Sequence, residues 1–77
     1  MWDSQNGLCA LTGRPMDIAT ATLDHIVPRA RGGSNELDNL RWTTKPANHA
    51  KGDLLDDEFV ELCKQVIANR EPVHADT

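Results

Sequence analysis

Two short segments of strand-forming residues, separated by a loop, restrict the topology of this chain more than any other feature. Residues 20–27 alternate as a half-buried strand does, and Pro28 ends them. Residues 39–44 form the second segment, and residues 29–38 between them lack periodicity and contain Gly32-Gly33. The pattern predicts an antiparallel pair of strands joined by a long loop. Loops of this length in compact domains usually carry function.

Two helices are predicted after the strands. Residues 45–52 have Thr44 in the N-cap position, Pro46 in the first turn and Gly52 just past the end, which predicts a short helix. Farther on, apolar residues recur with the period of an amphipathic helix; they are Phe59, Leu62, Cys63, Val66 and Ile67. Asp56 is the expected N-cap of this helix, and we expect its apolar face to pack on the core.

The length of 77 residues allows one domain with a thin core, because a chain this short buries only about 60% of its unfolded surface. The order strand, loop, strand, short helix and long helix predicts an α+β fold over residues 1–70. Residues 71–77 contain Pro72 and few apolar side chains, so we expect them to form a flexible tail.

The cysteine content limits which disulfide bonds or structural metal sites could stabilise the domain. Cys9 and Cys63 form no CxxC pair and cannot supply the four thiolates of a structural zinc site. A Cys9–Cys63 disulfide is open to the chain, but two reduced thiols are the simpler interpretation. The N-terminus has no signal-peptide pattern, and no stretch reaches membrane-spanning length, so we expect a cytoplasmic location without membrane contact.

The charge is unevenly distributed along the chain. The net charge is −4, but residues 25–51 have a balance of +3, against −2 for residues 1–24 and −5 for residues 52–77. Phosphate contact depends on the local field rather than on the total charge. The central segment is therefore a candidate nucleic-acid surface, although solvated surface residues would explain its charge equally well.

Asp24-His25 supplies residue types that suit phosphodiester hydrolysis. The reaction needs a base for the attacking water and a cation for the charge that develops on the phosphate. Imidazole titrates near neutral pH, and divalent cations prefer oxygen ligands. Neighbours on an ideal strand point to opposite faces, so the strand must end or twist near this pair, as Pro28 permits. An isolated Asp-His pair is usually structural, so the residues around it must show whether this pair is catalytic.

The wider pattern resembles the HNH endonucleases, a family with the ββα-metal (His-Me finger) fold. Residues 23–28, Leu-Asp-His-Ile-Val-Pro, are similar to the family's first motif. Gly32-Gly33 with residues 37–40, Leu-Asp-Asn-Leu, is similar to its loop and second motif, and residues 48–53, Asn-His-Ala-Lys-Gly-Asp, to its third. The resemblance covers residues 5–53, and the motif spacing is similar to the HNH domain of RNA-guided CRISPR nucleases. It implies a metal-dependent endonuclease that hydrolyses DNA phosphodiester bonds.

Carried over residue by residue, the resemblance implies four site residues. His25 takes the general-base position, and Asp24 takes a metal-ligand position. Asn39 takes the middle position, which orients the histidine by pinning the loop, although an Asx turn would explain it almost as well. Asn48 takes the second metal-ligand position, with His49 as the alternative. Family members have either residue type there, and only one of two adjacent helical residues can face the metal.

The resemblance also implies a cofactor and a partner. One divalent cation is expected, magnesium or manganese in first place and zinc or nickel in second, and double-stranded DNA is the expected partner. Phosphate contacts are expected from five basic residues, which are Arg29, Arg31, Arg41, Lys45 and Lys51. Zinc-containing members have two CxxC pairs, and the corresponding positions here are Cys9, Thr12, Thr44 and Ala47. No structural zinc is therefore expected; apolar packing of Leu11, Trp42 and the C-terminal helix should replace it.

Other functions also fit the sequence. A catalytically inactive module of the same fold would bind nucleic acid without cutting it. A protein-interaction module could use the acidic C-terminal helix, though a solvated helix face explains that charge as well. Trp42 could stack on a base, but strand alternation favours a core position. The oligomeric state stays open, and the chain could be part of a larger protein.

Overall fold

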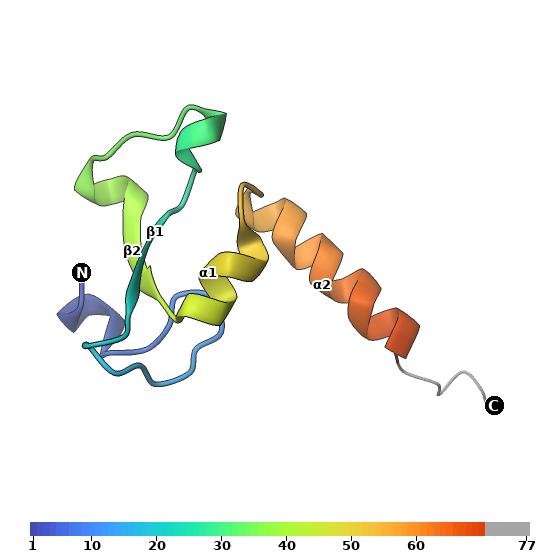
Figure 1. Ribbon diagram of the computed structural model, residues 1–77, viewed down its shortest axis with the longest axis horizontal. Coiled ribbons are helices and arrows are strands. Elements are labelled where there is room, and N and C mark those ends of the chain that lie inside the picture. Colours follow the sequence, from blue (N-terminus) through green and yellow to red (C-terminus); the bar gives the residue numbers. More distant parts are fainter. Residues whose placement is uncertain (71–77) are drawn as a thin grey trace.

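The computed structural model describes residues 1–70 and has the α+β architecture that the sequence predicts (Figure 1). Strands β1 (Thr22–His25) and β2 (Leu40–Thr43) form a two-stranded antiparallel sheet, and helix α1 (Lys45–Lys51) follows it. Helix α2 (Asp56–Arg70) ends the described part of the chain. The predicted ββα unit with an additional C-terminal helix is confirmed, whereas the predicted tail, residues 71–77, lies outside the described residues.

The register of the hairpin places Asp24 opposite Arg41 and His25 opposite Leu40. Both strands are shorter than the predicted segments. After His25 the chain leaves the sheet, because the backbone of Val27 bonds to the side chain of Asn39 instead of to a neighbouring strand. The connecting loop is not irregular throughout, since it contains 3-10 turns at Arg29–Arg31 and Leu37–Asn39.

Gln5 attaches the N-terminal segment to β2. Its amide nitrogen donates to the carbonyl oxygens of Leu8 and Trp42, and its amide oxygen accepts from the Trp42 N–H at 2.8 Å. The ring of Trp42 meets that of Trp2 edge to face, with 6.5 Å between centroids. Trp42 is half-buried in this contact, so it lies between the core position that strand alternation favours and an exposed position.

Helix α1 begins and ends where the sequence predicts. The Thr44 hydroxyl accepts from the Ala47 N–H at 3.4 Å, and Gly52 closes the last turn by donating to the carbonyl oxygen of Asn48. Helix α2 differs from expectation at its start. Asp56 is already helical and its carboxylate pairs with Arg41, so the predicted Asp56 N-cap is wrong. Glu58 caps the helix instead, by accepting from the Leu55 N–H at 3.0 Å.

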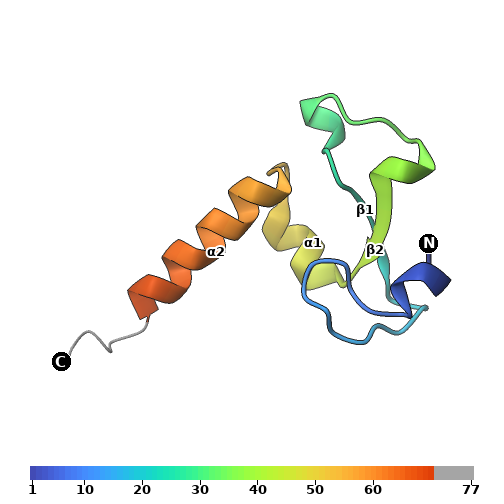
Figure 2. The same ribbon diagram turned by 180° about the vertical axis from the view of Figure 1, so that it is seen from behind.

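Helix α2 projects away from the hairpin, as the two opposite views in Figures 1 and 2 both show. No residue of α2 is buried, and Val66 and Ile67 are 55% and 54% exposed. The prediction that its apolar face packs on the core is therefore wrong for this chain taken alone. The amphipathic period shows that a face exists, but it cannot show whether the same chain provides the surface that covers it.

The buried centre of the described residues is small and largely polar. Its buried apolar side chains are Cys9 and Ala47, and its buried polar ones are Asp24, Thr43 and Lys51. A thin core is what the length predicts, and charged groups inside it must be paired to be tolerated. In the part of the chain that the structure describes, no helix is both long enough and apolar enough to cross a bilayer.

The first turn of α2 is tied to the loop by a pH-sensitive ion pair. The Arg31 guanidinium forms a two-bond pair with Glu58, which, together with the Leu55 N–H, lowers the pKa of Glu58 from 4.5 to about 2. Because the folded pKa is the lower one, this pair contributes stability fully above pH 4.5 and loses it as the pH falls towards 2. We expect the Leu55 amide resonance to titrate with a midpoint near 2. In Glu58→Gln this transition should be absent, and a wild-type midpoint near 4.5 would contradict the tie.

Candidate active site

Asp24 lies at the centre of a charge cluster that we define as Asp24, Arg41, Lys51 and Asp56. Its side chain is 3% exposed, and each carboxylate oxygen accepts from a different cation. Arg41 Nε donates to Oδ2 at 2.8 Å, and Lys51 Nζ approaches Oδ1 to 3.3 Å. Cross-strand pairing sets Arg41 opposite Asp24, so the hairpin register itself builds half of the cluster.

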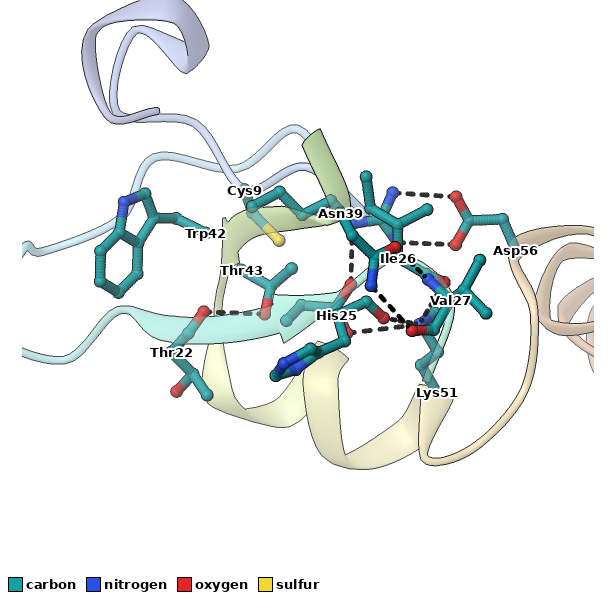
Figure 3. A network of polar contacts seen from close by, with 12 residues as sticks. Cys9, Thr22, His25, Ile26, Val27, Asn39, Trp42, Thr43, Lys51 and Asp56 are labelled. Carbon is teal, nitrogen blue, oxygen red and sulfur yellow. Dashed lines mark hydrogen bonds and ion pairs between the residues drawn. The ribbon is translucent and has the colours of Figure 1, made fainter. Parts of the chain in front are cut away.

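Lys51 joins α1 to the end of β1. Its side chain is fully buried, and besides Asp24 its ammonium group donates to the carbonyl oxygens of His25 at 3.0 Å and Ile26 at 3.3 Å. These two carbonyls belong to the residues where β1 leaves the sheet. Figure 3 shows Lys51 at the meeting point of these contacts, with the His25 ring pointing away from them. Lys51 therefore holds the backbone of His25 and Ile26 in place.

Arg41 links the cluster to α2. Its guanidinium makes two bonds with Asp56, of 2.8 Å and 2.6 Å, in addition to the bond with Asp24. Burial alone would lower the pKa of Arg41, but the two carboxylates outweigh it and raise the pKa. The hydrogen bond from Arg41 holds the pKa of Asp56 below its usual range. Two cations thus face two anions, and the cluster is neutral in sum.

His25 points from the other side of β1 toward the long loop. Its Nε2 lies 2.8 Å from Asn35 Oδ1. Because that oxygen can only accept, the contact is a hydrogen bond in the tautomer of neutral imidazole that has the proton on Nε2 and the lone pair on Nδ1. This arrangement sets the tautomer that a general base requires on its other nitrogen. Asn35 could not be selected from the sequence, because an asparagine in a Gly-Gly-Ser-Asn segment indicates only a turn.

Asn39 closes the neck of the long loop. Its Oδ1 accepts from the Val27 N–H at 2.9 Å, and its Nδ2 donates to the carbonyl oxygens of Val27 and Ser34 at 3.1 and 2.8 Å. All hydrogen-bonding positions of the amide except one acceptor site are thereby used. The contacts connect the residue two positions after His25 with the far side of the loop, which is the pinning geometry the resemblance implies for this position.

Gly33 fits against the same neck and tolerates no side chain. A Cβ at this position would lie 1.7 Å from the carbonyl oxygen of Val27 and 2.9 Å from Asn39 Nδ2. At Gly32 a Cβ would meet nothing within 4 Å, but the backbone is left-handed, with φ of 90°. The glycine pair therefore meets two separate requirements, close approach at one residue and a left-handed turn at the other.

We expect Gly33→Ala to destabilise the protein more than Gly32→Ala does. The Gly32 variant has only the left-handed backbone cost of roughly 1–2 kcal/mol. The Gly33 variant must separate Val27 from Asn39 and lose hydrogen bonds that each contribute about 1 kcal/mol. Urea unfolding of both variants measures the difference. Equal losses for the two variants would contradict the close approach at Gly33.

Asn48 and His49 lie differently on α1. Asn48 precedes Lys51 by three residues and so shares the helix face that contacts Asp24, and its side chain is half-buried. His49 is exposed. Within residues 1–70, the amide of Asn48 makes no side-chain hydrogen bond, which leaves its carbonyl oxygen available as a ligand. Of the two, Asn48 is thus the one that shares a helix face with Lys51, and its role as a metal ligand stays a prediction.

The five basic residues assigned to phosphate differ in exposure and in their ion pairs. Arg41 and Lys51 point into the charge cluster, at 15% and 0% side-chain exposure, so we correct the expectation that they contact phosphate. Their carboxylate and carbonyl partners satisfy them inside the domain. Arg31 is exposed but paired with Glu58. Arg29 and Lys45 are exposed and form no ion pair with any residue of the described part.

The four positions that correspond to a zinc knuckle are joined by hydrogen bonds. Cys9 is buried, and its sulfur accepts from the Thr44 N–H at 3.3 Å and lies 3.8 Å from the Thr44 hydroxyl. An isolated antiparallel bridge joins Leu8 and Pro15 on either side of Cys9 and Thr12. Burial raises the pKa of Cys9, but hydrogen bonds from Thr12 and from backbone N–H groups outweigh it and lower the pKa to about 7. The prediction that the C-terminal helix packs at these four positions is wrong, because no residue of α2 is buried.

Both cysteines are free thiols, as the simpler interpretation of the sequence holds. Among residues 1–70, no group of three or more histidine, cysteine, aspartate or glutamate side chains could enclose a metal ion. Two side chains supply oxygen donors for the implied metal: the Asp24 carboxylate, which keeps a lone pair on each oxygen, and the amide of Asn48, three residues before Lys51 on α1. Such a set suits a hard cation that keeps most of its ligands as water and substrate oxygens.

A family model described as HNH endonuclease matches residues 9–65, which is well over half of the chain. Two similar proteins are both named CRISPR-associated endonuclease Cas9. The one from Corynebacterium diphtheriae is 40% identical over 50 residues, and the one from Listeria innocua serovar 6a is 40% identical over 52 residues. Each alignment covers 64% of this chain but only 5% and 4% of the respective relative, so the chain spans a small part of the relatives it matches.

Proposed function

Because this chain belongs to the HNH endonuclease family, we propose that it hydrolyses phosphodiester bonds of double-stranded DNA with a divalent metal ion as cofactor. The observation that carries the proposal is the construction of β1 at its end. Asp24 is fixed on one face by two cations, and His25, on the other, is held by Asn35 with Nδ1 unprotonated. Because β1 ends at His25 and the chain leaves the sheet there, the base and the carboxylate need not stay on opposite sides, and at adjacent positions they can serve one phosphate.

His25 acts as the general base. Its Nδ1 takes a proton from the attacking water, and the resulting imidazolium keeps its Nε2–H bond to Asn35. The Asn39 clasp and the Lys51 bonds to the His25 and Ile26 carbonyls keep the ring in place, so little reorganisation is needed in the reaction. These residues position the base and need not touch the substrate.

Asp24 and Asn48 would hold the metal. Their donor atoms are a carboxylate and an amide oxygen, which magnesium and manganese accept readily. When bound, the cation would stabilise the negative charge on the phosphate and on the leaving 3′ oxygen. Arg41 and Lys51 fix the orientation of the Asp24 carboxylate by hydrogen bonds, a support that commonly contributes ten- to a hundredfold in metal affinity or activity.

Of the five basic residues assigned to phosphate, DNA contact falls to the two that are exposed and form no ion pair within residues 1–70, namely Arg29 and Lys45. Contacts of this kind position the phosphate backbone and do not read sequence. We therefore expect weak sequence preference from this domain alone. Any further specificity would come from a larger protein of which the domain is a part, in keeping with the small share of its relatives that it spans.

The test is nicking of supercoiled plasmid in magnesium, manganese, nickel or zinc, with EDTA as the metal-free control. We expect cleavage with magnesium or manganese and none in EDTA. Asn48→Ala should lower cleavage by about ten- to a hundredfold at limiting metal, because it removes a ligand. His49→Ala is the matched control on the next residue and should cleave like the wild type. If only His49→Ala lost cleavage, His49 and not Asn48 would be the metal ligand. Cleavage in EDTA would contradict the proposal that a metal is required.

A further inference from the structure

The apolar face of α2 has no partner within the described residues. Together with Ala50 of α1 it forms a groove of about 330 Å³, which is lined by Ala50, Phe59, Leu62, Cys63, Val66 and Ile67. Val60, Leu62, Val66 and Ile67 are each 44–55% exposed. Burying this much exposed apolar surface against a partner would lower the free energy of the protein.

The charges of α2 are arranged so that two copies of the helix complement each other in only one direction. Asp56, Cys63 and Arg70 follow each other at seven-residue spacing and therefore lie on one face, with the cysteine at the centre. The first turn of α2 contains Asp56, Asp57 and Glu58, whereas its last turn contains Arg70 and no acid. Parallel copies would set acid against acid, but antiparallel copies set each acidic end against a basic end.

We propose that α2 pairs with α2 of a second copy of this chain, in an antiparallel dimer whose twofold axis passes near Cys63. In this arrangement Phe59 faces Ile67 of the other copy, and Asp56 faces its Arg70. Asp56 can accept this second cation because its side chain remains 39% exposed beside Arg41. The helix dipoles also oppose each other, which favours the same direction.

The dimer is a weak one. A single pair of four-turn helices buries less surface than the roughly 800 Å² per partner of a standard stable interface. We therefore expect monomers at low micromolar and dimers at high micromolar concentration. The inference does not rest on nuclease activity, since neither His25 nor Asp24 lies on α2; only Asp56 is shared with the charge cluster, through its pair with Arg41.

Sedimentation velocity over that concentration range tests association. The wild-type mass should rise from 8.5 kDa to twice that value. Val66→Glu places a charge in the face and should weaken association by about tenfold or more. Ala68→Glu places the same charge on the opposite side of α2 and should associate like the wild type. A monomer at all concentrations, or equal effects of the two variants, would overturn the proposal.

Disulfide trapping tests the direction. Cys63→Ser is the common background, and Phe59→Cys and Ile67→Cys are made separately in it. Diamide oxidises two facing thiols to one disulfide, taking up the two electrons and two protons they release. An antiparallel dimer should give a covalent heterodimer when the two variants are mixed, in excess over either variant alone. Preferential crosslinking of Phe59→Cys to itself would indicate a parallel pair and overturn the arrangement.

Discussion

His25→Ala is expected to lower DNA cleavage by about 10²–10⁴-fold, the range that a positioned general base contributes. The ring lies half-buried at the end of β1, and its one side-chain hydrogen bond within the described residues goes to the exposed loop residue Asn35. The bonds that fix the strand end use backbone atoms of residues 25–27, which alanine retains. The fold and the binding of manganese should therefore persist. Single-turnover plasmid cleavage and manganese titration measure the two properties.

The control for this prediction is Asn35→Ala. It leaves the imidazole in place but removes the acceptor that fixes its tautomer, so cleavage should fall less than in His25→Ala. Circular dichroism of both variants should match the wild type. Cleavage by His25→Ala at the wild-type rate would exclude the histidine as the base, and loss of manganese binding together with cleavage would indicate a structural role instead.

The sequence predicted the parts of the fold that depend on local signals. Thr44, Pro46 and Gly52 set the bounds of α1 through backbone chemistry that acts within one helical turn. Strand alternation likewise predicted β1, although the strand ends at His25 and not at Pro28. The start of α2 was missed by one residue, because Asp56 has a distant partner, Arg41, that outcompetes the local capping role.

What the sequence could not give was the set of tertiary contacts around the site. From the sequence, Arg41 and Lys51 are predicted to be surface cations in a basic segment. Their burial in the charge cluster depends on the hairpin register and on the packing of α1. The same holds for Asn35, whose contact with His25 depends on how the loop closes at Asn39. Chemistry-bearing residues could be named from their pattern, but the residues that orient them depend on contacts distant in sequence.

Lys51→Met is expected to destabilise the domain by about 3–5 kcal/mol, the usual cost of removing one partner from a buried ion pair. The change leaves the Asp24 carboxylate with Arg41 alone and the carbonyl oxygens of His25 and Ile26 without their donor. A domain of this size has a total stability of about 4–12 kcal/mol, so a large share is lost. Urea unfolding followed by tryptophan fluorescence measures the effect, with Lys64→Met on the exposed face of α2 as the matched control.

A double-mutant cycle shows whether the loss comes from the pair itself. Asp24→Asn removes the buried negative charge, so in that background Lys51→Met no longer leaves two carboxylates, Asp24 and Asp56, to Arg41 alone. We expect the second change to be less costly there by about 1–3 kcal/mol, a coupling typical of residues in direct contact. Part of the cost should remain in both backgrounds, because the two backbone carbonyls still lose the ammonium group. Additive effects would mean that Lys51 and Asp24 are not coupled, and a Lys51→Met variant as stable as Lys64→Met would mean that Lys51 does not hold the end of β1.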